Sequence, residues 1–441
     1  MALIFSISGL RGVVTKELTP AIIFKYARDF GAYLKPGKVV MGRDARESGT
    51  IFRKAAIEGL NASGCEVVDL GIVPTPTVLF MVKKMKACGG IVITASHNPI
   101  QWNALKFVSS RGKFLNQREF STFSKLITQE KHVTSQEKQV DRVHIQSNSI
   151  DDHIDTIIKT LHTRARKLKI GVDAVNGAGS IALPKLLERI GCTVYRLNCA
   201  LSPIFPRRPE PTPENIGALC RLVKENNLDL GFAVDPDADR LSIVDEKGRA
   251  IGEENTLVLV TDYILRTSKG SVVTNLSTTA LMEYVARKYN CALFRTKVGE
   301  AHVVSKMESV DAIIGGEGNG GVIYPKINFT RDALVGAAII LKLLTEEKKR
   351  ISEILATYPQ YHIVKKKIRL SKEQFEKKEK KILATFQGKH NFTDGLRITG
   401  KEYWLHIRPS QTEPLIRIIG EARDKKLIKK HIYTIQSILK A

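Results

Sequence analysis

The sequence predicts an α/β protein of four domains: three similar α/β domains with mixed sheets and a smaller C-terminal α+β domain. Three observations support this prediction. The chain has 441 residues, which is more than one compact hydrophobic core usually serves. Short apolar runs alternate with amphipathic stretches over most of the chain, and its last part is richer in lysine and differently patterned. The hydrophobic and charged fractions, 43% and 26%, are those of an ordinary globular enzyme.

The first domain is expected to span residues 1–145. Thr19 and Pro20 are typical of a helix start, and apolar residues follow at helical spacing from Ile22 to Leu34. Strands that alternate with helices imply right-handed crossovers and a parallel or mixed sheet that is covered on both faces. The expected strands lie over 38–42, 65–70 and 89–94, and the expected helices over 49–64 and 77–86.

The same alternation is expected twice more, in domains over residues 150–250 and 251–358, after the polar and weakly periodic stretch 129–146. Strands are predicted over 168–174, 192–197, 228–234, 271–276, 291–296 and 311–316, with helices over 179–190, 216–227 and 279–289. The last domain, 359–441, is expected to contain a strand, a helix, two strands around 395–407, a strand over 414–419 and a final helix.

The formal net charge of +24 would suit nucleic acid, anionic lipid or a small anionic substrate as a partner. The densest lysine clusters contain few aromatic residues, so we interpret them as solvated helix faces or strand edges. A generally positive potential suits a phosphate-bearing substrate. No run of about 18 apolar residues predicts a membrane span. The six cysteines form no Cys-x-x-Cys pair, which is typical of reduced thiols in a cytoplasmic protein.

The motif 94-TASHNP-99 directly follows a buried-looking strand, at the sheet edge where open α/β folds usually carry their sites. There the hydroxyl of Ser96 can project from the sheet, with His97 beside it as a further donor. The alternative is an ordinary polar turn, because Ser, His, Asn and Pro are common turn residues.

A second motif, 235-DPDADR-240, also follows an apolar strand and places three carboxylates at alternate positions. Carboxylates this close repel one another unless a cation neutralises them, and their oxygens are ligands that Mg²⁺ prefers. We therefore predict a magnesium site rather than an acidic turn, formed by Asp235, Asp237 and Asp239. Arg240 adds a planar fork that suits a phosphoryl group or a ligating carboxylate.

Two further loops are weak signals when taken alone. The Gly-rich stretch 315-GGEGNGGVIYP-325 offers exposed amides together with the side chains of Glu317 and Asn319, and its spacing excludes a nucleotide P-loop. The stretch 408-RPSQTEP-414 is either a solvent-exposed turn or a phosphate-binding loop. Its candidate phosphate ligands are Arg408, Ser410 and Thr412, with Arg417 as a second cation.

These four motifs, in this order and at these intervals, resemble the α-D-phosphohexomutase superfamily, and 9-GLRG-12 and 42-GRDAR-46 extend the resemblance over nearly the whole chain. The resemblance implies four domains around a central cleft, each contributing one loop. By it, Ser96 is the phosphorylated serine, and the three aspartates hold one Mg²⁺ with a phosphoserine oxygen. Glu317 and Asn319 bind sugar hydroxyls. Arg408, Ser410 and Thr412 hold the phosphate that is not transferred. The transfer site is lined by Arg11, His97, Lys106 and Arg240, with Lys106 as a candidate general acid or base.

The resemblance implies an isomerase that interconverts hexose 6-phosphate and hexose 1-phosphate through the phosphoserine and a bisphosphorylated sugar. The sugar loop, 316-GEGNGG-321, departs from the G-E-x-S-G-H of many bacterial glucose/mannose members. Its E-x-N-G pattern is similar to the acetylglucosamine-phosphate branch. We therefore expect phosphoglucosamine mutase activity, on glucosamine 6-phosphate, ahead of phosphomannomutase/phosphoglucomutase activity.

The expected partner is a small phosphosugar, with no nucleic acid or membrane, and the expected assembly is a monomer or homodimer. The net charge of +24 keeps one other class open, a nucleic-acid-binding protein on a decayed mutase scaffold. No RNP, helix-turn-helix or zinc-finger signature supports that class. Steep salt dependence of submicromolar duplex binding would favour it.

Overall fold

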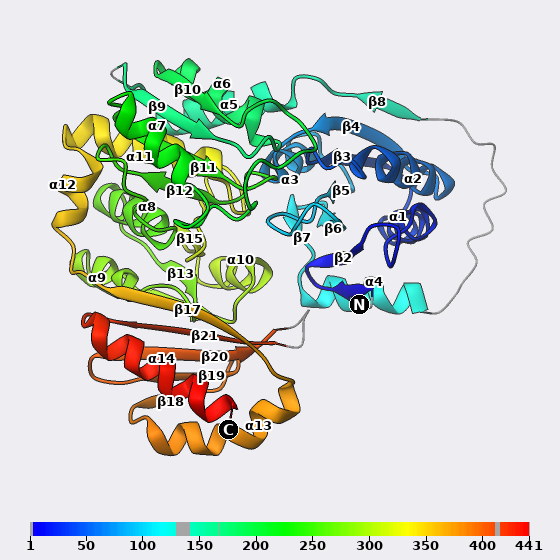
Figure 1. Cartoon of the computed structure of the whole chain (residues 1–441). Helices are drawn as coiled ribbons and strands as arrows, with labels where there is room; N and C mark the ends of the chain where they lie inside the picture. Colours follow the sequence, from blue (N-terminus) through cyan, green and yellow to red (C-terminus); the bar gives the residue numbers. More distant parts are fainter. Residues whose placement is uncertain (1–2, 129–141, 166, 411–414, 441) are drawn as a thin grey trace.

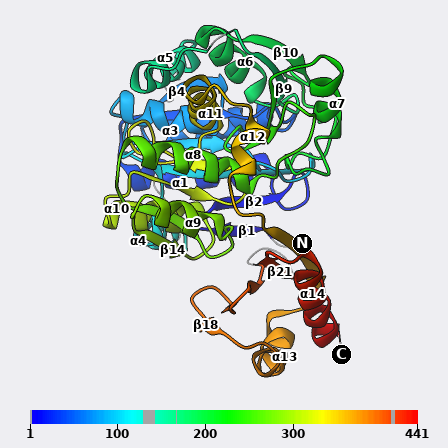
Figure 2. The same cartoon turned by 90° about the vertical axis from the view of Figure 1, so that its left-hand side faces the viewer.

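A computed structural model of the chain describes residues 3–128, 142–165, 167–410 and 415–440. The described strands form four sheets, of eight, four, four and five strands. The first three sheets and their helices form the upper part of the molecule in Figure 1, and the fourth domain, orange to red, projects from it (Figures 1 and 2). The fold class expected from the sequence is confirmed.

In the first domain the sheet has the order β1-β2-β6-β5-β3-β4-β8, with β7 beside β6. Thr19 caps α1 as expected, because its side chain accepts a hydrogen bond from the amide of Ile22 at 3.4 Å. The strands are β1 (Ile4–Ser6), β2 (Gly9–Val13), β3 (Lys38–Arg43), β4 (Glu66–Ile72), β5 (Gly89–Ile93), β6 (Trp102–Ser109), β7 (Lys113–Phe114) and β8 (Val143–Ile145). The helices are α1 (Pro20–Leu34), α2 (Gly49–Ala62), α3 (Thr75–Lys84) and α4 (Gln117–Thr128).

The second and third domains each have a four-stranded sheet, in the orders β10-β9-β11-β12 and β14-β13-β15-β16. The second contains α5 (Ser149–Leu161), β9 (Lys169–Asp173), α6 (Gly179–Ile190), β10 (Thr193–Leu197), α7 (Gly217–Glu225), β11 (Leu230–Val234) and β12 (Leu241–Val244). The third contains α8 (Glu254–Thr267), β13 (Val272–Asn275), α9 (Leu281–Lys288), β14 (Leu293–Thr296), α10 (Glu300–Ser309), β15 (Ile314–Glu317), β16 (Gly321–Ile323), α11 (Ala333–Glu347) and α12 (Ile351–Ala356).

One topology recurs in these three domains. The strands β4-β3-β5-β6 of the first sheet repeat the two four-stranded orders: three parallel strands, then a fourth antiparallel to the third. The loop after β5 that contains Ser96, the acidic loop 235–240 and the Gly-rich loop 316–321, which is the sugar loop expected from the resemblance, each connect the third strand of this unit to the fourth. Their shared position follows from the repeated topology, which the sequence indicated only as a recurring order of strands and helices.

The second and third domains share a hydrophobic core. Helices α8 and α11 are buried along most of their length and belong to one apolar cluster that extends from α5 and α6 to β16. Asp332 caps α11, because its Oδ1 accepts hydrogen bonds from the amides of Leu334 and Val335 at 3.0 and 3.2 Å. This shared core places the acidic loop 235–240 and the sugar loop in one packed body.

The fourth domain is an antiparallel sheet in the order β17-β21-β20-β19-β18, with α13 and α14 packed on one face. Its elements are β17 (His362–Arg369), α13 (Lys372–Thr385), β18 (Lys389–Asn391), β19 (Leu396–Thr399), β20 (Tyr403–Pro409), β21 (Leu415–Ala422) and α14 (Lys425–Lys440). Strand β17 runs along the boundary with the third domain (Figure 1).

Several strands were not expected from the sequence, among them β6, β12 and β16, the fourth strand of each repeated unit, and the short strands β8 and β18. Most of the polar stretch 129–146 lies outside the described residues, but Val143–Ile145 pair in parallel with β4. Strand β18 is fully exposed. Strands of three residues without a buried face carry no alternation that a sequence pattern could reveal. None of the described helices is long and apolar enough to cross a membrane.

Candidate active site

Ser96 lies at the carboxyl end of β5 in a left-handed backbone conformation, with φ of 49°. For a residue other than glycine this conformation costs roughly 1–2 kcal/mol, so the surrounding structure must hold it. The amide of Ser96 donates to Thr94 Oγ1 at 2.9 Å, and Thr94 Oγ1 donates in turn to Asp44 Oδ2 at 2.6 Å. The serine hydroxyl is thereby placed by contacts that start two residues earlier in the chain.

Arg46, which is fully buried, holds the rest of this loop. Its Nε donates to Asp44 Oδ2 at 3.0 Å. Its two terminal nitrogens donate, at 2.6 to 2.9 Å, to the carbonyl oxygens of Ser96, Asn98, Pro99 and Trp102. The sequence motif 42–46 contained Arg46 and Asp44, but nothing in their spacing indicated that they support the serine loop.

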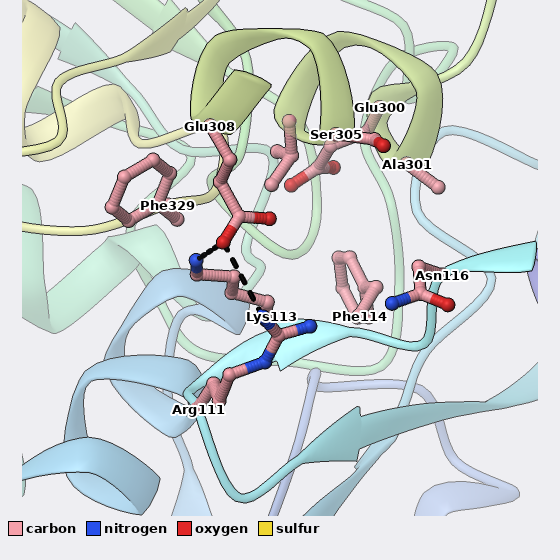
Figure 3. Close-up of a pocket in the computed structure, with 10 residues that line it drawn as sticks. Arg111, Lys113, Phe114, Asn116, Glu300, Ala301, Ser305, Glu308 and Phe329 are labelled. Atoms are coloured by element: carbon pink, nitrogen blue, oxygen red, sulfur yellow. Dashed lines mark hydrogen bonds and ion pairs between the residues drawn. The ribbon is translucent and has the colours of Figure 1, made fainter. Parts of the chain in front are cut away.

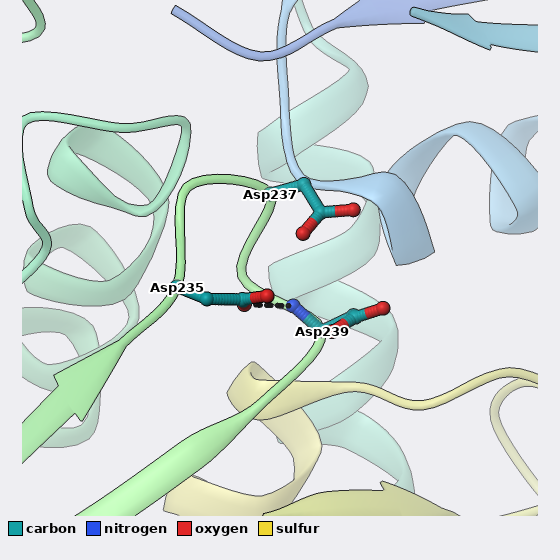
Figure 4. Close-up of side chains that lie close together, drawn as sticks. All are labelled: Asp235, Asp237 and Asp239. Atoms are coloured by element: carbon teal, nitrogen blue, oxygen red, sulfur yellow. Dashed lines mark hydrogen bonds between the residues drawn. The ribbon is translucent and has the colours of Figure 1, made fainter. Parts of the chain in front are cut away.

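The carboxylates of Asp235, Asp237 and Asp239 converge at the carboxyl end of β11, where they lie within 4.8 Å of one another and are buried (Figure 4). Asp235 Oδ2 accepts a hydrogen bond from Ser96 Oγ at 2.7 Å. Asp235 Oδ1 accepts from the amides of Asp239 and Arg240 at 3.1 and 3.2 Å. The structure thus brings the serine of the first domain into contact with the acidic loop of the second.

This cluster fits a divalent cation. Asp237 Oδ1 and Asp239 Oδ1 are buried and make no hydrogen bond within the described part of the chain. Burial, followed by the charges of Asp239 and Asp237, raises the pKa of Asp235 well above its usual range. Buried carboxylate oxygens with unused lone pairs are ligands that a hard cation such as Mg²⁺ prefers.

Lys106, on β6, lies against the acidic loop. Its Nζ is 2.8 Å from Asp237 Oδ2 and 3.9 Å from Asp239 Oδ2. Thr75 Oγ1 also donates to Asp237 Oδ2, at 2.7 Å. Burial alone would raise the pKa of Asp237, but Lys106 and the hydrogen bond from Thr75 outweigh it and hold this pKa below its usual range. The contact of Lys106 in the structure is an ion pair, and its role as general acid or base stays a prediction.

Arg240 and Arg331 are the other cations at the acidic loop. Arg240 Nη1 donates to Glu210 Oε1 at 2.9 Å, and its Nε lies 3.9 Å from Asp235 Oδ2. Arg331 was not singled out in the sequence, yet its Nη2 donates to Asp239 Oδ2 at 2.5 Å. A single arginine before a helix belongs to no recognisable motif, so its contact with Asp239 could be found only in the structure.

His97 lies next to Ser96, and Arg11 is within range of the charge of Asp237. The ring Nδ1 of His97 is 3.5 Å from Ser96 Oγ. Burial, followed by Arg240 and Arg11, lowers the pKa of His97 well below its usual value, so the imidazole is neutral at physiological pH. Burial and Arg240 also lower the pKa of Arg11, while Asp237 opposes them.

In the sugar loop, Glu317 is buried and almost fully bonded. Its Oε1 accepts from Asn275 Nδ2 at 2.8 Å and from the amide of Gly299 at 2.9 Å, and its Oε2 accepts from Arg331 Nη1 at 3.0 Å. Burial would raise the pKa of Glu317, but Arg331 and these hydrogen bonds lower it, so the carboxylate is ionised. Asn319 Oδ1 accepts from the amide of Gly321 at 3.2 Å, which shapes the Gly-rich turn.

The predicted phosphate ligands of the fourth domain are partly brought together. Arg408 on β20 and Arg417 on β21 are direct cross-strand partners, and Lys367 on β17 is the partner of Arg417 on its other side. Three cations therefore share one row of the sheet face that carries no helix, and Arg408 Nε lies 3.5 Å from Asp394 Oδ2. Ser410 donates from its amide to the carbonyl of Leu415 at 2.8 Å. Thr412 lies outside the described residues.

The same face of the fourth domain contacts the third. Lys365 Nζ lies 2.8 Å from carboxylate oxygens of both Glu253 and Glu254. His406 contacts Ser277 Oγ through Nδ1 at 2.8 Å, and its Nε2 donates to the carbonyl of Asp394 at 2.6 Å. Both ring nitrogens are thus used by a neutral imidazole at this boundary.

The neutral state of His406 predicts a pH-dependent stability. Burial lowers its pKa to about 4, with Arg397 and Arg408 acting in the same direction and Asp394 opposing them. This pKa is below the value of about 6.5 that histidine has in an unfolded chain. The contribution of neutral His406 to the free energy of unfolding is therefore complete above about pH 6.5. It is lost as the pH falls towards 4, and the loss reaches about 3 kcal/mol. Thermal unfolding of wild type between pH 7 and 4.5 should show this loss.

His406→Gln should show a shallower pH dependence, because glutamine can donate to Asp394 and accept from Ser277 without titrating. His390→Gln, at an exposed position on β18, is the control and should follow wild type. Equal pH dependence in all three proteins would contradict the assignment to His406.

A separate pocket lies between the first and third domains, bounded by β7 and α10 (Figure 3). Arg111 and Lys113 both point towards Glu308, and Lys113 Nζ lies 3.9 Å from the centre of the Phe329 ring. Glu300 lines this pocket, and it is also bonded to Arg331, which contacts Asp239 of the acidic loop. The contacts hold the two domains together at this edge, and no site residue predicted from the sequence is part of them.

Four family models match the chain in consecutive order. They are described as phosphoglucomutase/phosphomannomutase, alpha/beta/alpha domain I at residues 2–134, domain II at 151–248 and domain III at 253–361, and C-terminal domain at 366–431.

Similar proteins cover the whole chain. A phosphoglucomutase/phosphomannomutase of Thermococcus kodakarensis is 35% identical over 98% of this chain and 97% of its own length. A phosphoglucosamine/phosphogalactosamine mutase of Sulfurisphaera tokodaii is 33% identical over 100% of this chain and 99% of its own. A solved structure of a phosphoglucomutase/phosphomannomutase family protein from Burkholderia thailandensis has a TM-score of 0.85, with 25% identity over 99% of this chain and 98% of that one.

Proposed function

The chain belongs to the phosphoglucomutase/phosphomannomutase family, and from this premise we propose that it converts glucosamine 6-phosphate to glucosamine 1-phosphate through phospho-Ser96. It is a phosphohexomutase, as the resemblance of its motifs implied. The observation that carries the residue assignment is the contact of Ser96 Oγ with Asp235 Oδ2 at 2.7 Å, which joins the serine loop to the acidic loop.

In the proposed reaction, phospho-Ser96 gives its phosphoryl group to the free hydroxyl of a sugar monophosphate. The P–Oγ bond breaks, a P–O bond to the sugar forms, and the proton of the sugar hydroxyl ends on Ser96 Oγ, carried by a general acid or base for which Lys106 is the candidate. The sugar becomes a bisphosphate. The sugar then reorients, and Ser96 Oγ takes the other phosphoryl group, which leaves the isomeric monophosphate. Such transfers depend mainly on positioning and on stabilising charge on the moving group.

The acidic loop supplies the metal site in this proposal. Asp235, Asp237 and Asp239 would hold Mg²⁺, which when bound neutralises charge on the transferred phosphoryl group. Lys106 fixes Asp237 through its ion pair, and Arg240 lies beside Asp235. Neutral His97, next to Ser96 Oγ, offers a hydrogen bond without adding charge.

The sugar and the second phosphate would be held by the third and fourth domains. Glu317 is ionised, and its Oε1 already accepts two hydrogen bonds, so its free capacity is on Oε2. That oxygen can accept from a sugar hydroxyl or pair with a C2 ammonium group. The row of Lys367, Arg417 and Arg408 would bind the phosphate that is not being transferred. Ser410 and Thr412 stay predicted phosphate ligands from the motif alone.

The amino-sugar assignment is tested by substrate preference. We expect a higher kcat/KM for glucosamine 6-phosphate than for mannose 6-phosphate, measured in a coupled assay on one preparation. Asn319→Ser should narrow this preference by roughly ten- to a hundredfold, the usual effect of losing a matched polar contact. Asn319→Asp is the control for loop shape, since it keeps the oxygen that accepts from Gly321 but lacks the amide donors.

If Asn319 only shapes the turn, Asn319→Asp should keep the wild-type preference. A wild-type preference for mannose 6-phosphate would refute the amino-sugar assignment and favour the second candidate, phosphomannomutase/phosphoglucomutase activity. That candidate is supported by the name of the Thermococcus kodakarensis relative at 35% identity. The chemistry at Ser96 is common to both.

A further inference from the structure

One guanidinium, that of Arg331, binds three carboxylates from three segments. Its Nη2 donates to Asp239 of the acidic loop at 2.5 Å, its Nη1 to Glu317 of the sugar loop at 3.0 Å, and its Nε to Glu300 at the start of α10 at 3.0 Å. The side chain is 11% exposed. Every arm of the planar fork is therefore used, in a way that a lysine could not reproduce.

At the sugar loop, Arg331 Nη1 is the only hydrogen-bond donor to Glu317 Oε2 among the described residues. Its charge is also the main factor that opposes burial and keeps Glu317 ionised. Without the guanidinium, this buried carboxylate would keep the two donors to its Oε1 but lose the donor to its Oε2 and the main charge that compensates its own. Arg331 thus determines how Glu317 presents its remaining lone pair to a sugar.

At the acidic loop, Arg331 acts in the opposite sense. It occupies Asp239 Oδ2 and reduces the net negative charge of the cluster, to which Lys106 and Arg240 also contribute positive charge. A cation within hydrogen-bond distance of a ligating carboxylate competes with a metal ion for the same negative charge. Arg331 should therefore weaken metal binding while it supports sugar binding.

We propose that Arg331 is a positioning residue that links the two loops, holding Glu317 for the sugar and limiting the affinity of the acidic loop for a divalent cation. The proposal rests on the proposed phosphohexomutase function but not on which sugar is preferred. It predicts that removing the guanidinium strengthens the binding of Mg²⁺ and weakens the binding of the sugar phosphate. A residue that merely braced the fold would weaken both when removed.

The test measures the two ligands separately. Calorimetric titration of the full chain with Mg²⁺, without sugar, should show roughly three- to tenfold tighter binding in Arg331→Gln than in wild type. The KM of the same variant for its best sugar phosphate should rise roughly tenfold or more. Arg331→Lys should keep metal affinity near that of wild type, because the charge remains, while its KM still rises because the fork is lost.

The matched control is Arg295→Gln. Arg295 is a buried arginine of the same domain, 12% exposed, whose ion pair is with Glu283 and not with the acidic loop. Its replacement should leave the affinity for Mg²⁺ unchanged. In a double-mutant cycle, Arg331→Gln and Glu317→Gln should raise KM non-additively, because Arg331 acts on the sugar through Glu317.

Weaker Mg²⁺ binding in Arg331→Gln, or additive effects with Glu317→Gln, would overturn the proposal. If Arg331→Gln does not fold, Arg331→Lys provides the test. An unchanged affinity for Mg²⁺ together with a raised KM for the sugar phosphate would support the proposal, and any other combination would overturn it. Failure of the proposed function is distinguishable, since it would appear as absent mutase turnover in wild type on every hexose phosphate.

Discussion

Replacing Ser96 with alanine should abolish mutase turnover, with a loss of about 10³-fold or more, as is usual when a nucleophile is removed. Intact-protein mass spectrometry of active wild type should show one phosphate that disappears in the variant. The physical reason is that Ser96 supplies the hydroxyl that contacts Asp235, and alanine leaves the buried acidic loop without an acceptor for the phosphoryl group.

The backbone of Ser96 requires a second variant, because alanine is strained at a φ of 49°. Ser96→Gly removes the hydroxyl while relieving that strain, so equal loss in both variants identifies a chemical cause. Ser110→Ala, at an exposed serine just after β6 in the same domain, should keep both phosphate and activity. Full turnover by Ser96→Ala, with no phosphate elsewhere, would contradict the assignment.

The second large effect is expected at Asp237. Chelation of divalent cations should abolish activity, and added Mg²⁺ should restore it. Asp237→Asn keeps the size of the side chain but removes one negative charge from the cluster and puts an amide beside Lys106. Metal affinity should fall by at least the roughly 10–100-fold that is typical even for changes outside the ligand set. Titration calorimetry with Mg²⁺ measures this directly.

Asp245→Asn is the matched control for this experiment. Asp245 also follows a strand of the second domain and has the same exposed fraction as Asp237, 1%, but it bonds Arg249 instead of the acidic loop. It should leave the affinity for Mg²⁺ unchanged whatever it does to stability. Wild type that stays fully active in excess chelator would rule out the metal site.

Much of the fold was predictable because its signals are local. An apolar run followed by a polar loop identified the end of β5 and of β11, and the helix start at Thr19 and Pro20 was correctly placed. The recurring order of strands and helices indicated three similar domains. What no local pattern contained was the strand order, which places the serine, acidic and sugar loops at one equivalent position in three sheets.

The residues that sequence reasoning missed act over long separations. Thr75 bonds Asp237 across 162 positions of the chain, and Arg331 bonds Asp239 across 92. A threonine at the first position of a helix and a single arginine have no periodicity or spacing that could indicate such partners. The shared core of the second and third domains brings Arg331 to Asp239, whereas the contact of Thr75 with Asp237 joins the first domain to the second.

The sequence by itself determined the order of the elements and the chemistry of each loop: a serine, three aspartates, a glutamate among glycines, and arginines in the last domain. Only the tertiary structure decided how these groups are charged and bonded. Arg331 outweighs the effect of burial and keeps Glu317 an ionised acceptor, and strand pairing sets Lys367, Arg417 and Arg408 in one row. The physical reason is that charge state and hydrogen-bond capacity depend on neighbours in space, and these neighbours lie far apart in the chain.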